Sequence, residues 1–351
     1  MFSNNNKTVC IAMSGGVDSS TAAFLLKEAG FNVFGIFMKL WGEEGKVRGC
    51  CSLDDANDAL RVCEKIGIPF YVLNLKEEFR NEVIHYFVDE YAKGRTPNPC
   101  VYCNNKMKFD ILFKKAKTFG ADYIATGHYA RIEKNDNDYR LFKGIDANKD
   151  QSYFLFATEK EMLPFIMFPL GKLRKEEVRE IAEMAGLITS RKRESQEICF
   201  VKDDYREFLK MTGITEKRGK IVDRSGKVLG EHRGYFNFTI GQRSGLNIAL
   251  GKPVYVLKTI PEENVVIVGD ESELYQTDFT ICNCNFFEDI SMDERYFIKI
   301  RYRHKGEFGR IVAKRGGYYE VSFESPQRGI TPGQAAVFYK GDMVVGGGWI
   351  G

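Results

Sequence analysis

The sequence predicts an α/β protein in which a parallel sheet domain is followed by two small β-rich domains. Two observations lead to this prediction. Over the first 130 residues, apolar strand-like runs alternate with amphipathic helical patterns, which is typical of a parallel sheet with crossover helices on both faces. After about residue 205, alternating β-branched and aromatic residues are separated by glycine-containing turns, which indicates small β modules.

The elements of the first domain follow from its apolar pattern. A strand is expected over residues 7–13, and a helix over residues 18–29 is expected to end at Gly30. Further strands are expected over residues 31–38, 70–75 and 123–126, and further helices over residues 53–66, 77–91, 104–119 and 173–185. The polar residues 134–138 predict a hairpin turn. Ligands of parallel sheets bind at the carboxyl ends of the strands, so the functional site is expected there.

Length and composition limit the class of protein. The chain has 351 residues, which is enough for two or three domains; the expected boundaries are 1–204, 205–272 and 273–351. Hydrophobic residues make up 44% and charged residues 28%, a soluble globular balance. No apolar run approaches the roughly 18 residues of a membrane span, and the first residues do not resemble a signal peptide. We therefore expect a cytoplasmic protein with no membrane partner.

A serine- and glycine-rich turn joins the first predicted strand to the first predicted helix, in the string SGGVDSS. Its glycines let backbone N–H groups approach a phosphate, the helix N-terminus adds a positive dipole, and Ser19 and Ser20 add hydroxyl donors. The lysine of a Walker A motif is missing. A simple glycine turn capped by Asp18 is the alternative. In both cases Asp18 is expected at a solvent-facing helix start. The complete string favours phosphate binding.

Nine cysteines indicate reduced thiols, metal ligands or redox chemistry rather than a disulfide scaffold. Cys100 and Cys103 follow two prolines and lie just before a predicted helix, where the helix N-terminus lowers the pKa of a thiol. Cys199 is a third thiol, in the string ESQEICF. A redox dithiol, half of a zinc site and buried structural cysteines are all compatible with this pattern, although a zinc site requires four ligands and the sequence has no second Cys-x-x-Cys.

The string SGGVDS resembles the PP-loop of ATP pyrophosphatases, which have an adenine nucleotide alpha hydrolase-like fold. Over essentially the whole chain the sequence resembles the MnmA/TrmU family of tRNA-specific 2-thiouridylases, in GRTPNP, ATGHYAR, KDQSYFL, the ICF cysteine, FTIGQR and ITPGQAAVFY. This resemblance implies that residues 1–204 form a PP-loop catalytic domain with a helical tRNA-binding insertion, that 205–272 form a central β domain, and that 273–351 form a C-terminal β-barrel.

The same resemblance implies an activity. ATP adenylates the 2-carbonyl of the wobble uridine of tRNA, and sulfur transfer then gives 2-thiouridine with release of AMP and pyrophosphate. ATP and Mg²⁺ are the implied cofactors, since Mg²⁺ neutralises the phosphates. A cysteine desulfurase or a sulfur-relay protein is the implied sulfur donor. The implied ATP-binding residues are Ala12, Met13, Ser14, Gly15, Gly16, Val17, Asp18, Ser19, Met38 and Gly127.

The resemblance also implies roles for the thiols. The cysteine that matches Cys103 is the nucleophile of the family, and the one that matches Cys199 carries the sulfur as a persulfide, which Cys103 resolves as a disulfide. Many relatives have Asp where this chain has Cys100. The third thiol opens a second scheme, in which Cys100, Cys103 and Cys199 hold three irons of a 4Fe–4S cluster. The sequence leaves both schemes open.

Contacts with tRNA are the last expectation. Asn98, Pro99 and Cys100 are expected to border the target base, because an enzyme that reaches the 2-carbonyl must take the base out of the stack. The other implied contacts are His128, Lys149, Asp150, Gln151, Arg301, Tyr302 and Gln334. A structural histidine and a helix N-cap are the respective alternatives at His128 and Asp150.

The overall net charge of +3 does not indicate a nucleic-acid partner. Residues 299–315, however, contain seven Lys or Arg, one His and one acidic residue. We expect these cations to alternate along strands and line one face, where tRNA phosphates bind. An ordinary solvated β face is the alternative.

Two other classes of function compete with tRNA thiolation. A PP-loop ligase or amidating synthetase requires an ammonia source or an amino-acid site, and the sequence has no glutaminase-like segment. A non-catalytic iron–sulfur or RNA-binding module is disfavoured by the intact SGGVDSS string.

Overall fold

A computed structural model describes residues 6–41, 52–136, 138–193, 198–201, 204–248 and 251–351. The chain divides into two compact units. The first contains Met1–Val83, Cys100–Lys202 and Asp342–Val344, and the second contains Ile84–Pro99, Asp203–Gly341 and Val345–Gly351. Among the described residues, no helix has the length and apolar character that crossing a bilayer requires.

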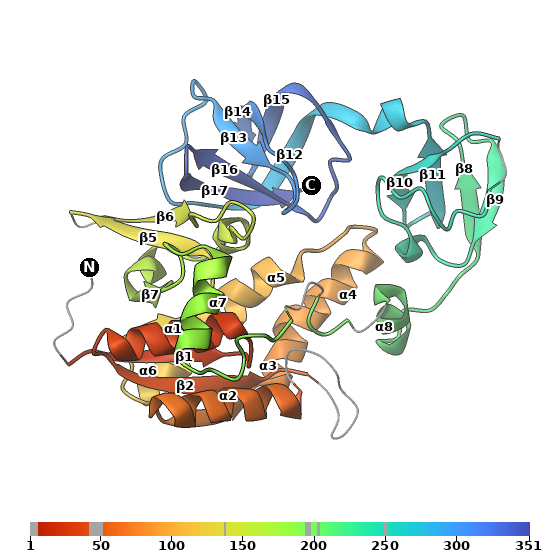
Figure 1. The fold of residues 1–351 in the computed structure, drawn as a ribbon. Helices are drawn as coiled ribbons and strands as arrows, with labels where there is room; N and C mark the ends of the chain where they lie inside the picture. Colours follow the sequence, from red (N-terminus) through yellow and green to blue (C-terminus); the bar gives the residue numbers. More distant parts are fainter. Residues whose placement is uncertain (1–5, 42–51, 137, 194–197, 202–203, 249–250) are drawn as a thin grey trace. The chain divides into compact units, whose positions relative to one another are not determined.

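A five-stranded sheet with the order β3-β2-β1-β4-β7 lies at the centre of the first unit (Figure 1). Its neighbouring strands pair in parallel, as the sequence predicts. The strands are β1 (Thr8–Met13), β2 (Asn32–Lys39), β3 (Phe70–Asn74), β4 (Tyr123–Ala125) and β7 (Ile166–Met167). The chain moves outward from β1 to β3 and then returns to the other side of β1. The strand order therefore reverses between β1 and β4, where ligands of such sheets bind at the carboxyl ends.

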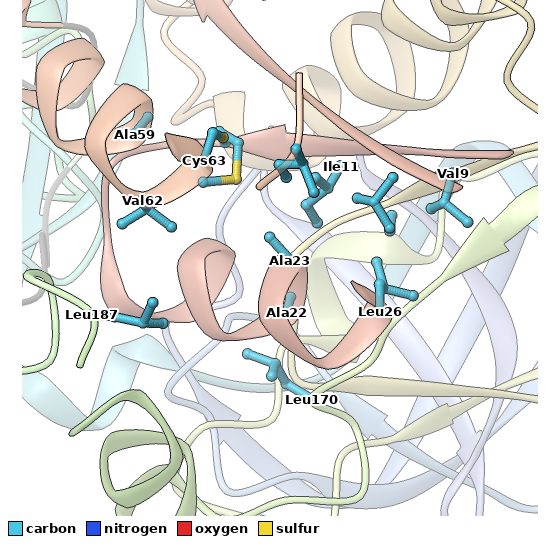
Figure 2. Close-up of a cluster of buried hydrophobic side chains, with 14 of the residues drawn as sticks. Val9, Ile11, Ala22, Ala23, Leu26, Ala59, Val62, Cys63, Leu170 and Leu187 are labelled. Atoms are coloured by element: carbon cyan, nitrogen blue, oxygen red, sulfur yellow. The ribbon is translucent and has the colours of Figure 1, made fainter. Parts of the chain in front are cut away.

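The core of this unit lies between one face of the sheet and three helices (Figure 2). These are α1 (Val17–Glu28), α2 (Leu53–Ile66) and α7 (Lys175–Met184). Ala22 and Ala23 of α1 are fully buried, and their small side chains let the helix lie close to the sheet. The same cluster contains Val9, Ile11, Leu26, Ala59, Val62, Cys63, Leu170 and Leu187.

Two long helices contain π-helical segments that periodicity did not predict. The predicted helix over 77–91 consists of α3 (Lys76–Phe79), a π-helix η1 (Arg80–Ile84) and α4 (His85–Ala92). The predicted helix over 104–119 consists of α5 (Pro99–Tyr102), a π-helix η2 (Cys103–Leu112) and α6 (Phe113–Thr118). This second helix begins five residues before the predicted start, because proline is well suited to the first helical position. Cys100 and Cys103 therefore lie inside the helix and not before it.

A hairpin and short 3-10 helices complete the first unit. Strands β5 (Ala130–Asn135) and β6 (Asp138–Lys143) pair antiparallel, as the polar stretch at 134–138 indicates, although residue 137 lies outside the described residues. The 3-10 helices η3 (Ser152–Leu155) and η4 (Lys160–Phe165) follow.

The second unit contains two β-rich modules. The central module has the strand order β10-β11-β8-β9. Its elements are α8 (Tyr205–Met211), β8 (Gly219–Val222), β9 (Val228–His232), η5 (Tyr235–Asn237), β10 (Tyr255–Ile260), β11 (Val265–Gly269) and η6 (Glu271–Leu274). Buried valines of β10 and β11 and Ile221 form its core. This module agrees with the predicted change of pattern after residue 205.

The C-terminal module is a closed antiparallel barrel. Its strands follow the order β12-β15-β14-β13-β16-β17, and β12 pairs again with β17. The strands are β12 (Tyr275–Phe286), β13 (Tyr296–Lys299), β14 (Glu307–Arg315), β15 (Tyr318–Arg328), β16 (Ala335–Lys340) and β17 (Met343–Ile350). Closure removes the exposed sheet edges.

Candidate functional site

The turn between β1 and α1 has the backbone geometry of an anion-binding loop. Gly15 has a φ of +70°, and a Cβ at this position would overlap the carbonyl oxygen of Asp55. Gly16 is the N-cap of α1 and contributes no side-chain hydrogen bond. The free N–H groups of the first helical turn and the helix dipole therefore favour an anion at this point.

Hydroxyl groups fix the shape of the loop. The Ser19 Oγ accepts a hydrogen bond of 3.1 Å from the backbone N–H of Ser14, and the two hydroxyls share another of 3.1 Å. The Ser20 Oγ donates to the carbonyl of Gly16 at 2.8 Å. Ser19 and Ser20 are buried, whereas Ser14 is exposed at the tip. The buried hydroxyls thus hold the loop, and Ser14 is the hydroxyl that a ligand can reach.

Asp18 is not a simple solvent-facing cap, which corrects the expectation from the sequence. Its Oδ1 accepts a hydrogen bond of 2.6 Å from the Lys175 ammonium and one of 2.7 Å from the Tyr129 phenol. The Lys175 side chain is only 7% exposed, while that of Asp18 is 31% exposed. A buried ammonium is costly without an anionic partner, so Asp18 has a structural role beside any role in binding.

Met38 and Gly127 lie beside this loop at the carboxyl ends of their strands. Met38 is the buried penultimate residue of β2, and β2 is the neighbour of β1. Gly127 follows β4, and a Cβ there would be 2.8 Å from the backbone N of Ser19. Glycine is therefore required where the β4 loop touches the first turn of α1.

Cys100 lies beside a cation that the sequence did not reveal. Its side chain is exposed, yet the surrounding protein raises the pKa of its thiol by desolvation, and the positive charge of Lys108 opposes this increase. The expected lowering of the pKa by a helix N-terminus is therefore not found at Cys100, because desolvation outweighs the favourable charges. Lys108 lies eight residues further along the same helix, a spacing at which local sequence reasoning does not pair two side chains.

The other two thiols are half-buried. Next to Cys103, the buried Asn104 donates a hydrogen bond of 3.2 Å to the carbonyl of Phe154. Next to Cys199, the buried ring of Phe200 packs edge-to-face on Phe79 at a centroid distance of 5.6 Å. The buried neighbours Asn104 and Phe200 thus fix the backbone next to Cys103 and Cys199, respectively.

The described residues contain no group of three His, Cys, Asp or Glu side chains that is arranged to hold a metal ion. The scheme in which Cys100, Cys103 and Cys199 hold three irons of a 4Fe–4S cluster therefore gains no support from the described residues.

His128 is buried rather than presented to a ligand. A Lys108 ammonium lies 3.5 Å from its Nε2 and can only donate, so Nδ1 carries the proton and donates to the Thr126 hydroxyl at 2.6 Å. Burial and the nearby charge of Lys108 hold the pKa of His128 well below its ordinary value. These contacts match the structural alternative for this residue.

The string Lys149-Asp150-Gln151 organises a loop. The buried Asp150 accepts hydrogen bonds from the backbone N–H groups of Gly144 and Ser152, both at 3.1 Å. The Gln151 Oε1 accepts from the N–H of Tyr129 at 3.0 Å. Lys149 is half-buried. Through Gln151 and Tyr129, this loop is linked to Asp18.

Arg301 contacts the barrel loop of residues 328–334, to which Gln334 belongs. Arg301 donates to the carbonyls of Arg328 at 3.0 Å and Gly329 at 3.4 Å. Gln334, five residues further on, donates to the carbonyls of Thr96 at 2.9 Å and Pro97 at 3.2 Å. Pro97, Asn98 and Pro99 are buried directly beyond this contact. The loop of residues 328–334 therefore joins residues that lie far apart in the sequence.

The basic stretch 299–315 does not alternate along strands throughout, which corrects the prediction. Residues 301–306 form a turn between β13 and β14. His304 is buried, accepts from the Ile300 N–H and donates to Gln327 at 3.0 Å. Lys299 lies over the ring of Tyr302 at 5.7 Å. The exposed cations of this stretch are Arg303, Lys305, Arg310, Lys314 and Arg315.

Three family models together match nearly the whole chain. Residues 7–203 match a family model described as a tRNA methyl transferase HUP domain, residues 206–270 match a tRNA methyl transferase PRC-barrel domain, and residues 276–350 match an aminomethyltransferase beta-barrel domain. A solved 4-thiouridine synthetase–RNA complex with bound ATP is 18% identical at a TM-score of 0.38, over 58% of this chain and 50% of its own. A likeness that weak assigns nothing to this chain.

Full-length relatives are much more similar. The tRNA-specific 2-thiouridylase MnmA of Carboxydothermus hydrogenoformans is 48% identical over 355 residues, which cover 98% of this chain and 97% of its own. That of Geotalea uraniireducens is 51% identical over 363 residues, or 99% of this chain and 96% of its own. That of Clostridium perfringens is 47% identical over 98% of both chains.

Proposed function

Because this chain belongs to the MnmA family of tRNA-specific 2-thiouridylases, we propose which of its residues perform each step of that reaction. The activity is a sulfurtransferase reaction, in which ATP adenylates a tRNA uridine and sulfur then replaces the 2-oxygen. The observation that carries the assignment of residues is the Ser14–Gly16 turn at the carboxyl end of β1, whose first helical turn on α1 has no side-chain cap.

ATP binds at this turn. Its phosphates take the N–H groups of residues 15–19 and the hydroxyl of Ser14, while Met38 and Gly127 border the adenosine on the neighbouring strands. The proposed residues are Ala12, Met13, Ser14, Gly15, Gly16, Val17, Asp18, Ser19, Met38 and Gly127. Mg²⁺ accompanies ATP as the counter-ion of its phosphates. Asp18 is the carboxylate of the loop, and its Oδ1 is already held by Lys175 and Tyr129, which leaves Oδ2 as the oxygen to face a cation.

The uridine lies next to the start of the thiol-bearing helix, bordered by Asn98, Pro99 and Cys100. Its 2-oxygen attacks the α-phosphorus of ATP, so that an O–P bond forms and pyrophosphate leaves. The adenylated oxygen is a good leaving group, because AMP departs with the electron pair of the C2–O bond. The other proposed tRNA contacts are His128, Lys149, Asp150, Gln151, Arg301, Tyr302 and Gln334. The side chains of His128 and Asp150 already make hydrogen bonds within the protein. We therefore infer that these two residues shape the backbone that contacts tRNA.

Sulfur comes from a persulfide on Cys199, which a cysteine desulfurase or a sulfur-relay protein supplies. The terminal persulfide sulfur attacks C2, and AMP leaves. The Cys103 thiolate then attacks the Cys199 sulfur, the S–S bond to the transferred sulfur breaks, and 2-thiouridine is released with a Cys103–Cys199 disulfide. An external thiol reductant supplies two electrons to restore both thiols. In the alternative scheme, Cys100, Cys103 and Cys199 would instead hold three irons of a 4Fe–4S cluster.

Ser14→Asp tests the ATP site. Ser14 is exposed, so a carboxylate there is tolerated by the fold but repels the ATP phosphates. We expect loss of ATP binding and of AMP formation. Ser272→Asp, at an exposed position in the second unit, is the matched control and retains both. Normal ATP binding by Ser14→Asp would show that the loop is not the phosphate site.

Cys100→Asp tests the sulfur step. Under the persulfide scheme this variant keeps most of its activity, while Cys103→Ser and Cys199→Ser abolish 2-thiouridine formation. Mass spectrometry after one turnover without reductant is expected to show the Cys103–Cys199 disulfide in the wild type. An active wild type that never forms this disulfide would contradict the proposed roles of the two thiols.

A further inference from the structure

Residues 92–97, with the sequence AKGRTP, connect α4 to the thiol-bearing helix. We call them the connector. The carbonyl of Ala92 lies at the end of α4 and those of Gly94 to Pro97 lie beyond it, so none of them has a partner within the helix. Backbone carbonyls in such a segment require other donors when water is excluded. Both β-rich modules of the second unit supply these donors.

The central module contributes two side chains. The Tyr235 phenol donates to the carbonyl of Ala92 at 2.5 Å, and the Thr259 hydroxyl donates to the carbonyl of Gly94 at 2.8 Å. The Tyr235 ring packs against the core of the module. Desolvation and the charge of Glu262 raise the pKa of this phenol, so it stays protonated and able to donate throughout the neutral range.

The barrel contributes the loop of residues 328–334. Gln334 donates to the carbonyls of Thr96 and Pro97 at 2.9 and 3.2 Å. In the other direction, the backbone N–H of Thr96 donates to the carbonyl of Pro332 at 2.9 Å. Five hydrogen bonds, to Ala92, Gly94, Thr96 and Pro97, therefore hold the connector.

Glycine stands at each point of closest approach. Gly94 has a φ of +69°, and a Cβ there would be 2.7 Å from the Thr259 hydroxyl and 2.7 Å from the Pro261 ring. Gly333 has a φ of +87°, and a Cβ there would be 2.9 Å from the Thr96 carbonyl oxygen. No other residue could bring either module this near to the connector. Gly94 thus allows the central module to approach the connector, and Gly333 allows the barrel to do so.

We propose that Tyr235, Thr259 and Gln334 are positioning residues for sulfur transfer. By holding the connector they fix Asn98 and Pro99, which follow it directly, and these are the residues proposed above to border the target uridine. The inference rests on that proposed function. It gives the central β module a defined part in the reaction. Misplacement of a reacting group by about 1 Å can cost roughly a hundredfold in rate, so the connector is a sensitive point.

Two conservative variants test this proposal. Tyr235→Phe and Thr259→Val each remove one donor and keep the shape of the side chain. Tyr255→Phe and Thr212→Val are the matched controls, because they remove a phenol contact with Glu271 at 3.5 Å and a hydroxyl-to-carbonyl bond of 2.8 Å within the end of α8. Neither control touches the connector.

Four quantities are measured for each protein: the single-turnover rate of 2-thiouridine formation at saturating ATP and tRNA, the Kd for tRNA, amide hydrogen exchange over residues 92–99, and the melting temperature. We expect the rate to fall about fivefold in each variant and roughly twentyfold in the double variant, as for the loss of one hydrogen bond each. The amides of the connector are expected to exchange faster, while the Kd and the melting temperature stay at the values of the controls.

The outcomes separate positioning from a merely structural role. Faster exchange with an unchanged transfer rate would overturn the proposal, as would an unchanged transfer rate with unchanged exchange. Gly94→Ala is a stronger second variant and is expected to lower the rate further at unchanged Kd. If the wild type and both controls form no 2-thiouridine, the proposed function itself fails, and this result differs from a loss confined to the connector variants.

Discussion

Removing the charges of Asp18 and Lys175, singly and together, measures how much the ion pair between the phosphate loop and this buried lysine contributes to stability. Lys175 is 7% exposed and Asp18 is 31% exposed at an N–O distance of 2.6 Å. Removing one partner of a buried ion pair costs about 3–5 kcal/mol. Because Asp18 retains some contact with water, we expect Asp18→Asn to cost about 3 kcal/mol, at the low end of that range.

The reverse change is expected to cost less. Lys175→Met leaves a carboxylate that still has water and the Tyr129 phenol, so the free energy of unfolding is expected to fall by about 1.5 kcal/mol. The double variant has no buried charge without a partner, and its free energy of unfolding is expected to fall by about 2 kcal/mol. The coupling free energy of the pair is then about 2.5 kcal/mol.

Urea unfolding measures these differences. Trp41 lies in the first unit with the pair, and Trp349 lies in the second unit, so a Trp349→Phe background makes tryptophan fluorescence report on the first unit. Lys252→Met is the control, since its ion pair with Asp270 has a similar distance of 2.7 Å but side chains that are 61% and 50% exposed, and it is expected to cost less than about 0.5 kcal/mol. Additive single variants, or an Asp18→Asn variant no less stable than Lys175→Met, would refute the reasoning.

Three further predictions concern Cys100, His128 and Gly15. The raised pKa of the Cys100 thiol predicts slower alkylation by iodoacetamide at pH 8 than for an ordinary cysteine. Lys108→Met is expected to slow this alkylation further, and faster alkylation in this variant would exclude Lys108 as the neighbouring charge. The pKa of His128 is lowered in the folded state, so the unfolded state binds more protons below about pH 6.5 and stability is lost as the pH falls; the loss between pH 7.5 and 5.5, measured by urea unfolding, is expected to shrink in His128→Gln. Gly15→Ala is expected to lose ATP binding and more than about 2 kcal/mol of stability through strain and overlap, whereas Gly120→Ala, with a φ of +82° and open space, loses only about 1–2 kcal/mol; equal losses would contradict the tight packing of the loop.

The periodicity of the sequence was sufficient to predict the regular helices and strands on which the site lies. The predicted helix over residues 53–66 has the observed bounds of α2, and the predicted strands 7–13 and 31–38 differ from β1 and β2 by a residue. These segments have a single period and clear ends, such as Gly67 with a φ of +69° after α2. Their parallel order also follows from the alternation of strands and helices.

Long-range contacts could not be predicted in this way. The sequence predicts a helix that starts after Cys103, with the two prolines before it, but Pro99 is its first residue. The partner of Asp18 is Lys175, which is 157 residues away, and no local pattern reveals a buried ammonium. In the same way, spacing along the sequence does not determine whether Cys100, Cys103 and Cys199 converge, so the choice between the persulfide and cluster schemes stays a prediction. The roles of individual residues in binding ATP and tRNA, and the domain boundaries, stay predictions.

The most direct test of the central claim is nucleoside analysis of an unmodified tRNA after incubation with the protein, ATP, Mg²⁺ and a persulfide donor. The account predicts one 2-thiouridine at the wobble position for each AMP and each pyrophosphate released. It also predicts that no 2-thiouridine forms with Ser14→Asp or without ATP. Formation of 2-thiouridine without AMP release, or AMP release with tRNA that never gains sulfur, would contradict it.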